Sequence, residues 1–211
     1  GTACLGAFRV PRPGHVLVLA AEDSPPQVRE RLEGLARVRD VSFDGLNVGL
    51  VLAPALRLER ERDRERLEAA VSRQQPRLLV LDPFIRLHGA DENSASEISA
   101  ILAALRDWQR RFHTAILVVH HARKGNGATP GMALRGSSDF HAWGDSNLYL
   151  QRADDEIVLS IEHRSAPSPD PMRLRLAADA GPAHLEIGDP SIRDPEPENL
   201  AKRILAELRR A

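Results

Sequence analysis

The stretch AILVVHHARK, residues 115–124, places two adjacent histidines directly after a run of aliphatic side chains. Two earlier stretches have the same form: VLVLAAED (16–23) ends in two acids, and LLVLDP (78–83) ends in an aspartate and a proline. Short, uninterrupted apolar runs of this kind are typical of strands buried on both faces of a parallel sheet. Each of the three predicted strands is therefore followed by a side chain that can hold a proton, a metal ion or a phosphate.

Amphipathic helices are predicted between these strands. The first, SPPQVRERLEGLARV, begins with Ser24 as an N-cap residue and with two prolines in its first turn. A charged helix is predicted over 59–75, a polar loop over 86–97 and an amphipathic helix over 98–112. This order predicts an α/β fold with a mostly parallel sheet flanked by helices. The apolar residues of the first helix recur at helical spacing: Val28, Leu32, Leu35 and Val38.

The second half of the chain has a different character. Residues 122–138 are rich in glycine and predict a loop. NLYLQRADDEIVLSIEHR (147–164) predicts a β-hairpin with its turn at two aspartates, and MRLRLAADAGPAHLEIG (172–188) predicts another. A proline-spaced linker then leads into a terminal helix. We expect one domain over 1–188, and a linker with the start of a helical appendage over 189–211.

Composition limits the class of protein. The 211 residues include 42% apolar and 28% charged side chains, and the net charge is −1, so any surface for nucleic acid must be local. The single cysteine excludes an internal disulfide and suits a reducing compartment. No apolar run approaches the ~18 residues of a membrane span. We therefore expect a cytoplasmic protein that has no membrane partner.

The polar residues after the three strands are expected to meet. In open parallel sheets, ligands bind beyond the carboxyl ends of the strands, where Glu22, Asp82 and the pair His120–His121 are predicted to lie. In nucleoside triphosphate hydrolysis, an aspartate holds Mg²⁺ through water, a glutamate deprotonates the attacking water, and a polar side chain contacts the γ-phosphate. Adjacent side chains on a strand point to opposite faces, so one histidine should face the site, and we favour His121.

Together, the motifs AAEDSPPQVRERL, LLVLDP, HGADEN, HHARK and RGSS resemble the RepA-type branch of RecA-like (AAA family) ATPases, which are relatives of hexameric replicative helicases. The resemblance covers residues 1 to about 165. It implies a RecA-like core with C-terminal β-hairpins, the cofactors ATP and Mg²⁺, assembly into a homo-oligomeric ring, expected to be a hexamer, and action on single-stranded DNA in replication. It also makes Asp82 the Walker B aspartate, Glu22 the catalytic glutamate and His121 the sensor. The remaining candidate nucleotide-binding residues are Asp23 and His120.

The sequence departs from this family in two places. It contains no G-x-x-x-x-G-K-S/T motif, and the family's phosphate-binding strand and helix precede a segment like GTACLG, with which this chain begins. We therefore expect this chain alone to lack the phosphate cradle and to be inactive. The family also supplies an arginine to the neighbouring subunit from a position that is occupied here by Asp145. Arg152 or Arg164 is the candidate for this arginine finger.

The glycine-rich loop over 122–138 carries Arg123, Lys124 and Arg135, which suit contacts to DNA phosphates or to a neighbouring subunit. Two other functions remain open. The missing phosphate-binding loop favours a non-catalytic, replication-regulatory or ring-scaffold subunit. A metal-dependent hydrolase would use four side chains as direct ligands: Glu22, Asp82, His120 and His121.

Overall fold

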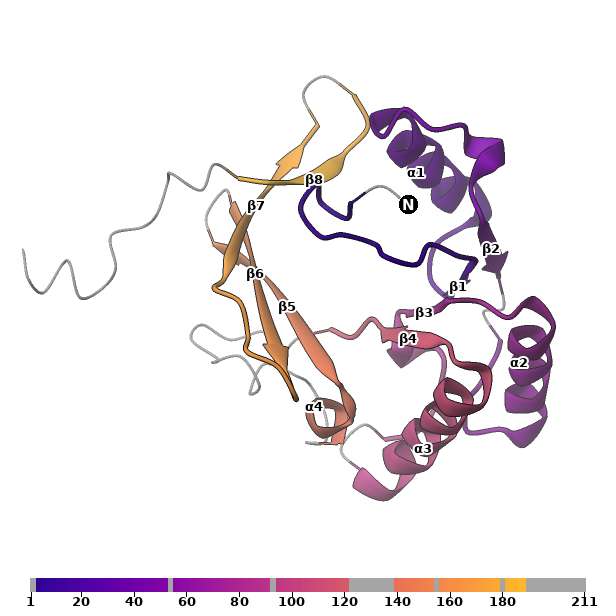
Figure 1. Cartoon of the computed structure of the whole chain (residues 1–211). Coiled ribbons are helices and arrows are strands. Elements are labelled where there is room, and N and C mark those ends of the chain that lie inside the picture. The colour runs from indigo at the N-terminus through magenta and orange to yellow at the C-terminus, as the bar shows by residue number, and fades with distance from the viewer. Residues whose placement is uncertain are drawn as a thin grey trace, which may run out of the picture.

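The computed structural model describes residues 3–52, 55–91, 94–121, 139–153, 156–178 and 181–188. A four-stranded sheet forms its centre, and all neighbouring strands in this sheet are parallel (Figure 1). The strand order is β2-β1-β3-β4, so the three strands predicted from the apolar runs are neighbours. The strands are β1 (Val16–Ala20), β2 (Val48–Val51), β3 (Leu78–Asp82) and β4 (Ala115–Val118).

Three helices flank this sheet: α1 (Pro25–Val38), α2 (Glu61–Gln74) and α3 (Ala95–Phe112). The N–H and the hydroxyl of Ser24 both donate to Oε1 of Gln27, at 3.0 and 2.7 Å, so α1 begins at the predicted N-cap. Helix α3 begins three residues earlier than predicted, because the N–H of Ile98 already donates to the carbonyl of Ser94 at 3.2 Å. Two short 3₁₀ turns complete this half: η1 (Phe43–Gly45) and η2 (Phe84–Arg86).

One apolar residue of α1 does not pack as its spacing predicts. Leu35 is 39% exposed, whereas Gly34 and Ala36 are buried. Pro182, which comes 148 residues later in the sequence, lies very close to Gly34. A Cβ atom added to Gly34 would lie 2.7 Å from the Cβ atom of Pro182. A distant segment therefore decides which side of α1 is buried.

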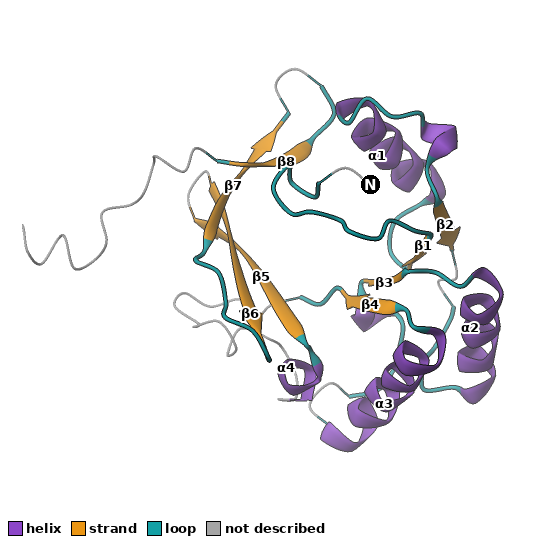
Figure 2. Cartoon of the chain, viewed as in Figure 1, coloured by secondary structure: helices purple, strands orange, loops and turns teal. Residues whose placement is uncertain are grey.

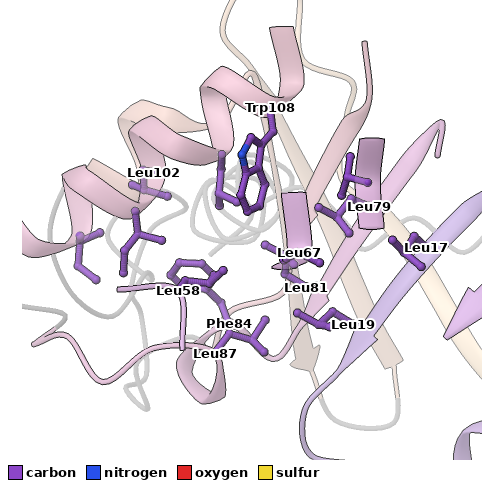
Figure 3. Packing of buried hydrophobic residues seen from close by; sticks show 14 of the residues in the cluster. Leu17, Leu19, Leu58, Leu67, Leu79, Leu81, Phe84, Leu87, Leu102 and Trp108 are labelled. Atoms are coloured by element: carbon purple, nitrogen blue, oxygen red, sulfur yellow. The ribbon is translucent and has the colours of Figure 1, made fainter. Parts of the chain in front are cut away.

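The hydrophobic core lies between the parallel sheet and the two helices α2 and α3 (Figure 3). Trp108 of α3 is 2% exposed, and its Nε1–H donates to Oε2 of Glu68 on α2 at 3.0 Å. Figure 2 shows α2 and α3 on the side of this sheet that faces away from the second sheet. The strands contribute alternate residues to the core: Leu17, Leu19, Leu79 and Leu81.

The opposite face of the parallel sheet is only partly covered. Helix α1 lies over β2, where Leu32 lines a cavity of about 430 Å³ together with Val48 and Leu50. Further along the same face, Val80 is half-buried and Leu117 of β4 is 41% exposed. The strands were predicted to be buried on both faces of the sheet. They are buried on the face that α2 and α3 cover, but only partly buried on the other face.

A second sheet, antiparallel and ordered β5-β6-β7-β8, follows a short helix α4 (Asp139–Trp143) that the sequence did not predict. Both predicted hairpins are confirmed. The turn between β5 and β6, and residues 189–211, lie outside the described residues, so the domain boundary at 188 stays a prediction. The strands are β5 (Ser146–Ala153), β6 (Glu156–His163), β7 (Met172–Ala177) and β8 (His184–Ile187). Within the described part of the chain, none of the helices has the length and apolar character needed to cross a bilayer.

Candidate functional site

The carboxyl ends of β1, β3 and β4 are joined by backbone hydrogen bonds that continue past the strands. The N–H of Ala21 donates to the carbonyl of Asp82 at 2.9 Å, and the N–H of Val119 donates to the carbonyl of Leu81 at 3.0 Å. The N–H of Phe84 in turn donates to the carbonyl of Val119 at 2.8 Å. The residues that follow Ala21 and Val119, namely the acidic pair 22–23 and the histidine pair 120–121, therefore emerge at the same edge of the sheet as Asp82.

Electrostatic interactions show how close these side chains are. The pKa of Asp82 is raised above its ordinary value of 3.8, chiefly because burial removes water from its carboxylate. The neighbouring negative charges of Asp23 and Glu22 raise the pKa further, whereas Arg31 and His121 lower it. Both predicted acids of the pair 22–23 and the predicted sensor histidine thus act on the charge of Asp82, although Glu22 and His121 are 99 residues apart in the sequence.

Two arginines, neither of which the sequence singled out, neutralise the acids of the pair 22–23. Arg86 donates to Oε1 of Glu22 through Nη2 at 3.1 Å and through Nε at 3.4 Å. Arg31 donates to Oδ2 of Asp23 through Nη1 at 2.8 Å. Arg86 lies four residues after Asp82, which is the only hint that the sequence offers for its place in the site.

The two histidines have different surroundings. The ring of His120 stacks on that of Phe140 in α4, with centroids 4.7 Å apart and an angle of 21° between the planes. Phe84 meets the same Phe140 ring edge-on at 5.6 Å. His121 is exposed and acts on Asp82. The role of His121 as a phosphate sensor, and that of His120 in binding nucleotide, remain predictions.

The segment after Asp82 is more ordered than the predicted polar loop over 86–97. The Asp82–Pro83 peptide is cis, and the chain continues into the turn η2, with Phe84 and Leu87 both 0% exposed. The N–H of Leu58 donates to the carbonyl of Leu87 at 2.7 Å, and His88 is 5% exposed. The first part of the predicted loop is therefore a core element, because its apolar residues pack under the end of β3.

The position expected to supply an arginine to a neighbouring subunit holds Asp145, which links helix α3 to Arg164, the residue that follows β6. Its Oδ2 accepts hydrogen bonds from Arg106 at 2.9 Å and from Gln109 at 3.3 Å. Arg164 contacts Oδ1 of Asp145 at 3.5 Å and donates to the carbonyl of Ala142. Arg164 is thus engaged within the chain. Arg152 lies on β5 opposite Ile157, and a finger role for either arginine remains a prediction.

The predicted DNA-contact residues Arg123, Lys124 and Arg135 lie outside the described residues, so their role is also still a prediction.

In the helix α4, His141 Nε2 lies 3.0 Å from Oε2 of Glu162. Trp143 donates from Nε1 to the carbonyl of Leu102 at 3.0 Å, which fastens α4 to α3.

The donor set fits a hard divalent cation better than a transition-metal cage. Asp82 would hold Mg²⁺ through bound water, and the negative charges of Asp23 and Glu22, which raise the pKa of Asp82, are of the kind that Mg²⁺ compensates. Within the described ranges, no group of three His, Cys, Asp or Glu side chains is arranged to hold a metal ion directly. The 211 residues contain no G-x-x-x-x-G-K-S/T motif, and the expectation that the chain alone lacks the phosphate cradle stays a prediction.

Comparison with known proteins gave a family and a fold. A family model described as an AAA domain matches residues 1–127, which is more than half of the chain. The crystal structure of the RadB recombinase matches with a TM-score of 0.56 and 19% sequence identity, over 78% of this chain and 76% of that chain. No curated protein gave a significant match. The RadB likeness establishes a RecA-like fold. The match over residues 1–127 shows that the chain belongs to the AAA domain family.

Proposed function

We propose that the protein is a RepA-type ATPase that couples Mg²⁺-dependent ATP hydrolysis to the binding of single-stranded DNA and the unwinding of DNA in replication, as a homo-oligomeric ring. One observation carries this proposal: Glu22, Asp82 and His121 come together at the carboxyl edge of a RecA-like sheet. The resemblance of the motifs to the RepA-type branch supplies the finer identity. The DNA, the ring and its expected six subunits belong to the proposal.

Each of the three side chains has a distinct role in this function. Asp82 would hold Mg²⁺ through bound water, and Asp23 beside it would add negative charge to the same place. Glu22 would accept the proton of the attacking water. His121 would donate a ring N–H to an oxygen of the terminal phosphate. Bound Mg²⁺ would supply compensation for the charge that develops on the phosphate oxygens.

The parallel sheet offers a place for the phosphate-binding element that this function needs. β4 ends the sheet, and among the described residues its outer edge pairs with no strand. On β4 itself, Leu117 is 41% exposed. A further strand pairing with β4 would bring a phosphate-binding loop beside His121.

The runner-up is a non-catalytic ring or regulatory subunit. The observation that favours it is the lack of a G-x-x-x-x-G-K-S/T motif in the 211 residues. Such a subunit would keep the RecA-like fold and its subunit contacts but would not turn over ATP. Turnover by the full-length gene product distinguishes the two functions.

The test takes the full-length gene product, including any sequence that the gene encodes beyond residues 1 and 211. We expect Mg²⁺-dependent release of phosphate from ATP, stimulated by single-stranded DNA. DNA affinity should fall as salt rises, and Lys124→Ala should weaken it at every DNA sequence, because phosphate contacts do not read bases. Ring size follows from the mass of the assembly. ATP binding without turnover would favour the non-catalytic subunit, and the absence of both would contradict the proposal.

A further inference from the structure

We propose that Arg86 is a positioning residue, which orients the carboxylate of Glu22 for the activation of water. This inference rests on the proposed function, and it adds a residue to which neither the sequence motifs nor the comparisons give a role. It starts from the geometry of one ion pair at the carboxyl edge of the sheet.

The guanidinium of Arg86 holds one of the two oxygens of Glu22. Nη2 and Nε both point to Oε1, at 3.1 and 3.4 Å. Among the described residues no hydrogen bond to Oε2 of Glu22 is present. The pair therefore fixes the plane of the carboxylate through one oxygen and leaves the other oxygen to accept a proton.

The backbone of Arg86 is well anchored, although its side chain is 60% exposed. The backbone of Arg86 closes the turn η2: its N–H donates to the carbonyl of Pro83 at 3.1 Å, and its carbonyl accepts from Arg57 at 3.0 Å. The neighbours Phe84 and Leu87 are fully buried. The Glu22 side chain is 49% exposed and lies beyond the end of β1. Because its backbone is held in this turn, Arg86 can restrict the rotamers of Glu22 through the ion pair, which is how residues around a site orient the residues that react.

The charges around Glu22 give the pair a second effect. The Glu22 and Asp82 carboxylates repel each other, and Arg31 is already paired with Asp23 at 2.8 Å. Arg86 supplies the positive charge that holds Glu22 close to Asp82 and Asp23. Without it, we expect Glu22 to turn toward solvent and to spend less time beside the attacking water.

The test measures ATP turnover by the full-length gene product with Arg86→Ala, Arg86→Gln and Arg86→Lys. We expect Arg86→Ala and Arg86→Gln to lower kcat about 10- to 100-fold, the range found when supporting residues around a site are removed, with KM changed less than about threefold. Arg86→Lys should keep part of the rate, and millimolar guanidinium should restore part of it to Arg86→Ala. The matched control is Arg111→Ala, because Arg111 also forms an exposed ion pair, with Glu68 at 2.7 Å, but on α3.

A double-mutant cycle separates positioning from a general structural effect. If Arg86 acts through Glu22, Arg86→Ala should cause no further loss on the residual turnover of Glu22→Gln. Unchanged or increased kcat in Arg86→Ala, or additive losses in the cycle, would overturn the inference while leaving the proposed function intact. Wild-type turnover that is insensitive to Glu22→Gln would instead contradict the proposed function, and the role of Arg86 with it. The midpoint of thermal unfolding is measured for each variant, with Arg86→Lys as the mildest change. A variant that unfolds at the wild-type temperature but turns over ATP slowly has lost positioning and is not misfolded.

Discussion

The carbonyl of Asp82 accepts a hydrogen bond from the N–H of Ala21 at 2.9 Å, one residue before Glu22. The ladder between β1 and β3 thus continues to the edge of the sheet and holds two acids side by side. Repulsion between them adds to the burial that raises the pKa of Asp82. Acids that meet at the carboxyl edge of a parallel sheet are a common feature of functional sites, which makes this edge the candidate site.

Asp82→Asn is expected to stabilise the protein at pH 7. Because the pKa of Asp82 is raised in the folded protein, the folded state binds the proton more tightly than the unfolded chain does. Stability is therefore lost as pH rises from the ordinary value of 3.8 through the raised pKa, and the ionised group is unfavourable at pH 7. We expect a gain of about 1 kcal/mol in the free energy of urea unfolding, typical of single stabilising changes. The gain should disappear near pH 3; a loss of stability at pH 7 would contradict this view of Asp82.

Asp145→Asn is expected to have the opposite effect. The hydrogen bond from Arg106 is the main cause of the lowered pKa of Asp145, with Gln109 and Arg164 contributing. A lowered pKa means that the ionised group stabilises the fold above pH 3.8, and that this stabilisation is lost as pH falls through the lowered pKa. Since the side chain is 56% exposed, we expect only about 0.5–1 kcal/mol at pH 7. Unfolding curves at pH 7 and pH 3, with Asp107→Asn as an exposed control, measure this; an equal effect at both pH values would refute it.

Phe140→Ala is expected to destabilise the junction between α4 and the sheet. Phe140 is 7% exposed and touches both His120 and Phe84. Removing a buried phenylalanine costs about 3–5 kcal/mol, whereas Phe140→Leu should cost less than about 1.5 kcal/mol. Phe8→Ala, at a residue that is 37% exposed, serves as the control and should change the free energy of unfolding by less than about 0.5 kcal/mol. Similar effects of the substitutions at Phe140 and Phe8 would show that the aromatic contacts do not hold α4.

Local sequence patterns predicted most of the fold. The strands before Glu22, Asp82 and His120, the three long helices and both hairpins all follow from apolar periodicity, caps and turn residues. The convergence of the site residues followed from a rule about parallel sheets rather than from any single motif. The strands, helices and hairpins depend on residues close together in the sequence, and the convergence of the site depends on the order of the strands. Both can therefore be predicted from a single sequence.

The parts that the sequence did not predict depend on contacts between distant segments. Arg86 and Glu22 are 64 residues apart, and nothing in the residues near Arg86 indicates which acid it pairs with. The stacking of His120 on Phe140 depends on α4, which is only five residues long and lacks a helical apolar period. Leu35 is exposed for a similar reason, because the packing of Pro182 on Gly34 decides which side of α1 is buried.

Glu22→Gln in the full-length gene product tests the central claim most directly, with ATP binding and turnover measured on the same preparation. The amide keeps the size of the side chain but cannot take up a proton from water. If Glu22 is the base beside Asp82 and His121, ATP should bind with unchanged affinity, while kcat falls by at least about 100-fold, the lower end of what general-base catalysis contributes. Turnover equal to that of the wild type would contradict the site described here.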